Sequence, residues 1–80
     1  MVRVVLSNSM LAVTGSAKEL DVTATNFRQL TLGLMDQWPA LAELIDSSAV
    51  AIDGQIYQDA FAEPLQEQSE VFFMPRIEGG

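Results

Sequence analysis

The 80-residue sequence contains no cysteine and no histidine. It therefore lacks thiol nucleophiles, imidazole acid–base groups, disulfide bonds and the usual ligands of zinc and iron–sulfur clusters. The remaining catalytic candidate is a set of carboxylates, Asp53, Asp59 and Glu63, but acidic residues in turns are ordinary turn formers and these lack metal-ligand spacing. We expect no metal site, no bound cofactor and no catalysis by the chain itself.

Positive charge is also scarce. The sequence has four basic and eleven acidic residues, which gives a net charge of −7. Such a surface repels phosphate backbones and anionic lipids, so we expect neither nucleic acid nor membrane partners. The charge favours a basic protein partner, and the alternative is that it only keeps a small domain in solution. The basic residues are Arg3, Lys18, Arg28 and Arg76.

Long apolar runs are missing as well. No run approaches the ~20 residues of a membrane span. The apolar stretch within Met1–Ser7 is too short for a signal peptide and has no small-residue cleavage site. We therefore expect a cytoplasmic protein, and its length allows one domain with one core.

The amino-terminal half predicts two strands and a helix. Val2–Leu6 and Glu19–Thr23 alternate as half-buried strands do, and we expect the residues between them, including the apolar run 10–14, to form the irregular tip of a hairpin. Asn26, with Gln29 three positions later, is typical of a helix start, and Pro39 ends that helix. Residues 40–46 predict a second short helical turn. The apolar residues that follow at helical spacing are Phe27, Leu30, Leu34 and Trp38, with Met35 beside them.

The carboxy-terminal half predicts a hairpin and a closing strand. Asp53-Gly54 lies between the apolar segments 50–52 and 55–57, which is the commonest signature of a tight hairpin. A loop over 59–64 leads to a last strand over Glu70–Met74. Pro75 has no N–H to donate, so we expect the strand to stop before it.

This order of elements predicts an α+β protein with a β-grasp fold: a mixed sheet of four to five strands, one main helix packed on one face, and the first and last strands adjacent in the middle. Alternation then divides the side chains between two faces. The outward face would carry Val5, Phe72 and Met74, which indicates a contact surface unless they are ordinary exposed residues. The expected core is Val2, Val4, Leu6, Leu20, Val22, Leu30, Leu34, Val71 and Phe73.

Residues 75–80 predict a flexible tail that follows a domain over 1–74. About five extended residues at ~3.3 Å each let the terminal carboxylate reach ~15 Å from the body. The terminal Gly79-Gly80 carries no Cβ, so a narrow channel could close around it. The tail suits insertion into the active site of a partner, and the alternative is a frayed chain end.

The last ten residues, Val71-Phe72-Phe73-Met74-Pro75-Arg76-Ile77-Glu78-Gly79-Gly80, resemble the carboxy-terminal signature of ubiquitin-like sulfur carriers. They look most like the small subunit of molybdopterin synthase, in which an apolar strand, a proline, a β-branched residue and Gly-Gly recur at this spacing. Length and element order fit the same family.

The resemblance implies a protein co-substrate rather than an enzyme. An E1-like adenylyltransferase would use ATP to activate the carboxylate of Gly80, and a sulfur donor protein would convert it to a thiocarboxylate. The tail, with Pro75, Ile77 and Gly79, would then thread into the large synthase subunit and deliver sulfur to a pterin precursor. Val5, Phe72, Met74 and Arg76 would bind the partners.

Three positions depart from the family pattern and leave the acceptor open. Arg76 stands where a second proline is common, Glu78 where a small residue is usual, and Gln68-Ser69 replaces a Gly-Asp turn. Thiamine-pathway carriers share the fold but generally lack the proline. The chain could also be a carrier for a different sulfur pathway, a modifier that joins Gly80 to lysine, or an interaction module with an incidental tail.

Overall fold

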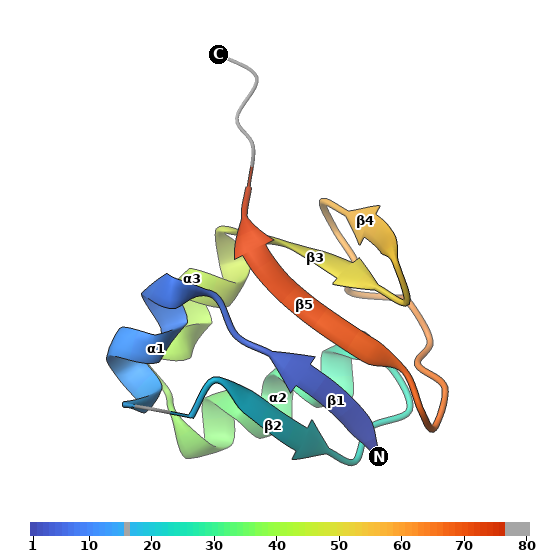
Figure 1. Ribbon diagram of the computed structural model, residues 1–80, viewed down its shortest axis with the longest axis horizontal. Helices are drawn as coiled ribbons and strands as arrows, with labels where there is room; N and C mark the ends of the chain where they lie inside the picture. Colours follow the sequence, from blue (N-terminus) through green and yellow to red (C-terminus); the bar gives the residue numbers. More distant parts are fainter. Residues whose placement is uncertain (16, 77–80) are drawn as a thin grey trace.

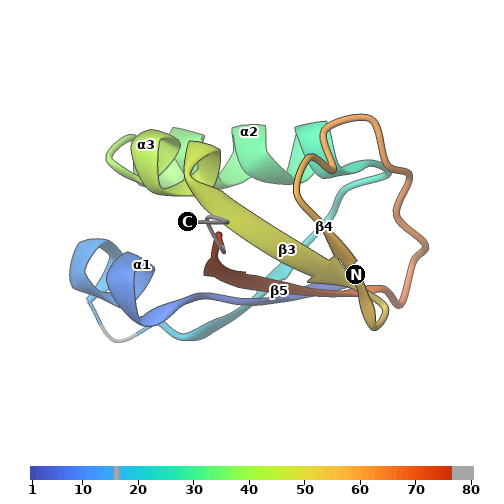
Figure 2. The same ribbon diagram turned by 90° about the horizontal axis from the view of Figure 1, so that it is seen from above.

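The computed structural model describes residues 1–15 and 17–76. Within them, five strands form one sheet in the order β2-β1-β5-β3-β4, with α2 and α3 on one side (Figures 1 and 2). This mixed sheet with a main helix on one face confirms the predicted α+β architecture. The elements are β1 (Val2–Val5), α1 (Asn8–Thr14), β2 (Glu19–Val22), α2 (Phe27–Gln37), α3 (Leu41–Asp46), β3 (Ser48–Ile52), β4 (Gln55–Tyr57) and β5 (Glu70–Pro75).

The centre of the sheet is β5, which pairs in parallel with β1 and antiparallel with β3. The first and last strands are therefore adjacent, as the sequence predicts. The last strand runs one residue further than expected, because Pro75 lies opposite Ser48 at the end of the β3 ladder. The missing N–H of Pro75 is tolerated there because a strand end loses little pairing. The division into a domain over 1–74 and a tail over 75–80 stays a prediction.

The main helix begins and ends where the sequence predicts. The Asn26 side chain accepts a hydrogen bond from the Gln29 amide at 2.8 Å, and the Gln29 side chain accepts one from the Thr25 amide at 3.0 Å. The reciprocal cap thus reaches one residue further back than in a standard capping box. Gly33 lies on an exposed turn of α2, where a Cβ would meet only Val22 Cγ1 at 3.9 Å, so this glycine is tolerated rather than required by close packing.

One prediction about the first hairpin is wrong. Residues 8–14, expected to be part of an irregular tip, form α1. The Ser7 carbonyl accepts hydrogen bonds from the amides of Met10 and Leu11, both at 3.1 Å. Met10 is fully buried, and α1 contacts α3. The helix ends at Gly15, whose φ of 84° suits a residue without a side chain.

The predicted core is confirmed. Seven of its residues are buried, and Leu20 and Val22 are partly buried against them. Phe73 packs on Phe27 with ring centroids 5.8 Å apart. The sequence does not specify the structure of residues 46–49; here α3 ends at Asp46 and β3 already starts at Ser48. Buried apolar residues that were not in the expected core are Met10, Ala24, Phe27, Leu41, Ala49, Val50, Ile52, Ala60 and Leu65.

Candidate functional site

The face of the sheet opposite α2 carries an apolar row that crosses four strands. Val5 on β1 lies opposite Phe72 on β5, Phe72 lies opposite Ala51 on β3, and Ala51 lies opposite Ile56 on β4. Side chains of paired residues point to the same face. Phe72 and Ile56 are 41% and 65% exposed. We call these four residues, with Met74 beside them, the open-face row.

The structure places Val5, Phe72 and Met74 on one face of the sheet, as predicted. They are not equally exposed to solvent. Val5 and Met74 are half-buried, and Phe72 is the most open of the three. Ile56 and Ala51 were missed by sequence reasoning. The Asp53-Gly54 turn is a signal in the sequence that predicts this pair, because a two-residue turn fixes which residues of the hairpin lie opposite each other. An apolar row of this kind at the surface is typical of a protein contact.

Charged residues border the row on the side of β2. Arg3 forms an ion pair with Glu19 and lies 3.7 Å from Glu70. The hydrogen bond from Arg3 and the negative charge of Glu19 raise the pKa of the Arg3 guanidinium, which therefore stays charged. Since two carboxylates surround one cation, the border keeps a negative excess. An apolar centre with a polar rim is the usual anatomy of a protein interface.

The chain leaves the sheet from its central strand, between β1 and β3 (Figure 1). Beyond Pro75 the Arg76 guanidinium donates a hydrogen bond to the Gln58 carbonyl at 3.0 Å. Arg76 is thereby directed to the helix side of the sheet and does not join the open-face row with which the sequence grouped it. Ile77, Gly79 and Gly80, the predicted tail residues, lie outside the described residues.

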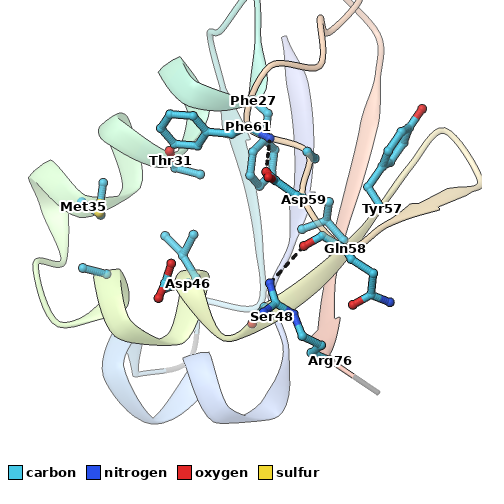
Figure 3. Close-up of a pocket in the computed structure, with 14 residues that line it drawn as sticks. Phe27, Thr31, Met35, Asp46, Ser48, Tyr57, Gln58, Asp59, Phe61 and Arg76 are labelled. Carbon is cyan, nitrogen blue, oxygen red and sulfur yellow. Dashed lines mark hydrogen bonds between the residues drawn. The ribbon is translucent and has the colours of Figure 1, made fainter. Parts of the chain in front are cut away.

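Arg76 lines a groove on the helix side, with a volume of about 710 Å³ (Figure 3). Its walls are α2, α3 and the segment that follows β4, and its floor is β3. Sequence reasoning missed this groove, because its walls are far apart along the chain. We call it the helix-side groove. It is lined by Phe27, Thr31, Met35, Ala42, Ile45, Asp46, Ser48, Val50, residues 57–61 and Arg76.

The three carboxylates considered as a catalytic set have separate roles. Both oxygens of Asp53 accept hydrogen bonds from the start of β5, from the Ser69 hydroxyl at 2.8 Å and the Glu70 amide at 2.9 Å. Asp59 accepts from the Phe61 amide at 3.2 Å. Desolvation, and then the charge of Glu63, raise the pKa of the Tyr57 phenol. Within the described residues, no group of three acidic side chains could hold a metal ion.

Asp53 is therefore a structural clamp between the β3–β4 turn and β5. Its φ is 49°, which glycine adopts without strain. We expect Asp53→Gly to lower the free energy of unfolding by about 1–3 kcal/mol, because the buried Ser69 hydroxyl loses its acceptor. Asp53→Ala should cost about 1 kcal/mol more, because alanine is strained at positive φ. Urea denaturation of both variants measures this, and a wild-type midpoint for Asp53→Gly would contradict the clamp.

Comparisons with known proteins address the fold. No family model matches the chain, and no curated protein matches it in sequence. Solved structures do match. The small archaeal modifier protein 1 of Methanosarcina acetivorans has a TM-score of 0.80 at 22% identity, with 99% of this chain and 95% of that chain covered. The chain has a ubiquitin-like β-grasp fold.

Two further structures of this fold are complexes. The Amycolatopsis orientalis BexX/CysO complex matches with a TM-score of 0.77 at 11% identity over both whole chains. The complex of subunits 1 and 2 of the Helicobacter pylori 26695 molybdopterin-converting factor matches at 0.67 and 16% identity, covering 99% of this chain and 97% of that chain. At the level of the fold, the resemblance to ubiquitin-like carriers and modifiers is confirmed.

No helix in the described part of the chain is long and apolar enough to cross a membrane.

Proposed function

We propose that this β-grasp protein is a sulfur carrier whose terminal glycine is activated by a partner enzyme. The observation that carries the proposal is the course of β5, which holds the exposed Phe72 and continues through Pro75 toward Gly79-Gly80. A partner that docks on the open-face row therefore lies beside the root of the tail. The body supplies a docking surface, and the partner supplies the catalytic groups.

The proposed chemistry has two steps. A carboxylate oxygen of Gly80 attacks the α-phosphorus of ATP, and pyrophosphate leaves to give an acyl-adenylate. A sulfide equivalent from the donor protein then attacks the acyl carbon, and AMP leaves with the carboxylate oxygen to give a thiocarboxylate. The first step is needed because a carboxylate oxygen is a poor leaving group until it is bonded to phosphate. The need for ATP favours the cytoplasm.

For the acceptor we propose the molybdopterin pathway, with delivery of sulfur to a pterin precursor held by a large synthase subunit. The order of apolar strand, Pro75, Ile77 and Gly79-Gly80 supports this choice, and the molybdopterin-converting factor is among the structures of similar fold. Arg76 and Glu78 are the positions at which another sulfur pathway, such as thiamine thiazole synthesis, would differ. The genes beside this one would distinguish these pathways.

The proposal is tested by intact mass after incubation with ATP, sulfide and a cognate adenylyltransferase. Exchange of oxygen for sulfur adds about 16 Da, and alkylation of the new thiol group by iodoacetamide confirms its chemistry. An unchanged mass, with adenylate formation and pyrophosphate release also undetected, would overturn the proposal.

A second candidate is a protein modifier, which is favoured by the similarity to a modifier protein at a TM-score of 0.80. The same acyl-adenylate would then be attacked by a lysine ε-amine of a target protein, with AMP as the leaving group. A ladder of conjugates that resists denaturation and thiol reagents would identify this fate. Formation of the thiocarboxylate with no ladder of conjugates would identify the chain as a sulfur carrier.

The open-face row gives a prediction for partner docking. We expect Phe72→Ala to weaken binding of the adenylyltransferase by about tenfold or more, because large exposed aromatic residues often dominate an interface. The free energy of unfolding should change little, since Phe72 is already 41% exposed. Titration calorimetry measures the affinity. If the adenylyltransferase bound the wild type and Phe72→Ala equally well, its docking site would lie outside the open-face row.

A further inference from the structure

The helix-side groove is a second binding surface, on the opposite side of the sheet from the open-face row. We propose that it binds a segment of a protein partner in which an apolar side chain lies next to lysine or arginine. The lining of the groove and the charge of the chain support this proposal. It does not depend on the fate of the terminal glycine.

The apolar part of the proposed segment is indicated by the residues at the mouth of the groove. Phe61 is 54% exposed, while Met35 and Ile45, which line the same groove, are half-buried. The Asp59 side chain accepts a hydrogen bond from the Phe61 amide and fixes the backbone there, and the Arg28 guanidinium lies 5.8 Å from the centre of the Phe61 ring. A held aromatic ring beside an open groove is suited to an apolar anchor.

The basic part is indicated by two exposed carboxylates in the lining (Figure 3). Asp46 comes from the end of α3, and Asp59 comes from the segment after β4. Ion pairs in the described part of the chain all involve Arg3, so neither carboxylate is paired. The lining also holds one cation, Arg76, which donates to the neutral Gln58 carbonyl and keeps its charge, so the lining carries a negative excess of one charge. A lysine or arginine placed at Asp46 or Asp59 would meet complementary charge.

The same charges disfavour two other occupants. The residues that follow Arg76 include the acidic Glu78, so the protein's own tail would bring negative charge to Asp46 and Asp59. A second copy of the chain brings a net charge of −7. Like charges brought close together raise the free energy of the complex. A basic segment from another protein is the occupant that the groove complements.

The volume sets the size of that segment. About 710 Å³ falls within the range of ligand pockets, about 300–1,000 Å³, and is enough for a few side chains but not for a whole folded domain. We therefore expect a short peptide to reproduce the interaction.

The test uses acetylated ten-residue peptides in which one phenylalanine, leucine or tryptophan lies between two pairs of lysines. They are titrated into the isotope-labelled full chain, and backbone amide shifts are followed by NMR. Saturable shifts should centre on Met35, Ile45 and Phe61. Matched peptides with glutamate in place of lysine should not bind, and added salt should weaken the lysine peptides because it screens the carboxylates.

Variants separate the two parts of the proposal. Phe61→Ser should weaken binding about tenfold, and the double change Asp46→Asn with Asp59→Asn should weaken it and reduce the salt dependence. Asparagine keeps the oxygen that accepts from the Phe61 amide, so the fold is retained. Phe72→Ala, on the opposite face, is the matched control and should bind as the wild type does.

Three outcomes would overturn the proposal. The first is the absence of saturable shifts at millimolar peptide, and the second is equal binding of the glutamate peptides. The third is tighter binding by a chain that ends at Arg76, because this would identify the protein's own tail as the occupant. Loss of sulfur transfer with peptide binding intact would count against the proposed function alone.

Discussion

Phe73→Ala is expected to lower the free energy of unfolding by about 3–5 kcal/mol, the usual range for removing a buried aromatic ring. Phe73 is 5% exposed and lies on the central strand, where it packs against Phe27 of α2 with ring centroids 5.8 Å apart. Its loss would leave a cavity between the sheet and its main helix. For a domain of this size, whose total stability is typically about 5–15 kcal/mol, this is a large fraction.

The neighbouring residue provides the control for that experiment. Phe72→Ala removes the same side chain from the same strand, but on the open face, and should cost about 1 kcal/mol or less. Urea denaturation of both variants, analysed with a shared slope, measures the difference. If Phe72→Ala were the more destabilising of the two, Phe72 would point into the core and Phe73 would lie on the open face.

Gly79→Ala is expected to slow formation of the thiocarboxylate by about 100-fold. The added Cβ would not fit a narrow active-site channel of the adenylyltransferase and would displace the reacting carbonyl carbon. The measurement is the rate of the mass gain of about 16 Da with ATP, sulfide and the adenylyltransferase. Thermal unfolding should be unchanged, because residue 79 follows the last strand. Gly79 lies outside the described residues, so this prediction tests the proposed tail chemistry alone.

A matched glycine substitution shows whether the effect belongs to the tail. Gly33→Ala adds the same methyl group on α2, where the nearest atom is Val22 Cγ1 at 3.9 Å. It should leave the rate unchanged and raise stability by up to about 1 kcal/mol, because alanine favours the helix. If Gly79→Ala reacted as fast as Gly33→Ala, the channel would not be narrow at that residue.

The sequence predicted the sheet and the main helix because their signals are local. Alternation placed Val2, Val4, Val71 and Phe73 in the core, and Asp53-Gly54 determined a hairpin whose two turn residues both have positive φ. The helix over 8–14 was missed because it is short, and its stability comes from burial of Met10 rather than from a side-chain cap, which Ser7 does not provide. Contacts of that kind are not encoded within a short window.

The candidate site was predicted in part for the same reason. Val5 and Phe72 follow from alternation along single strands, whereas Ile56 joins them only through the register of two further ladders. The orientation of Arg76 depends on a carbonyl eighteen residues earlier in the chain. The helix-side groove depends on the packing of two helices and a loop over β3, which no local pattern specifies.

The position of β5 also determines how the domain responds to force. This strand is bonded on both sides, to β1 and to β3, and its ladder bonds run across the strand rather than along it. A partner that holds the open face and pulls on the chain beyond Pro75 would load both ladders in shear, so their bonds must yield together instead of unzipping one by one. The domain is therefore mechanically suited to having its end drawn into a tight channel without being unravelled.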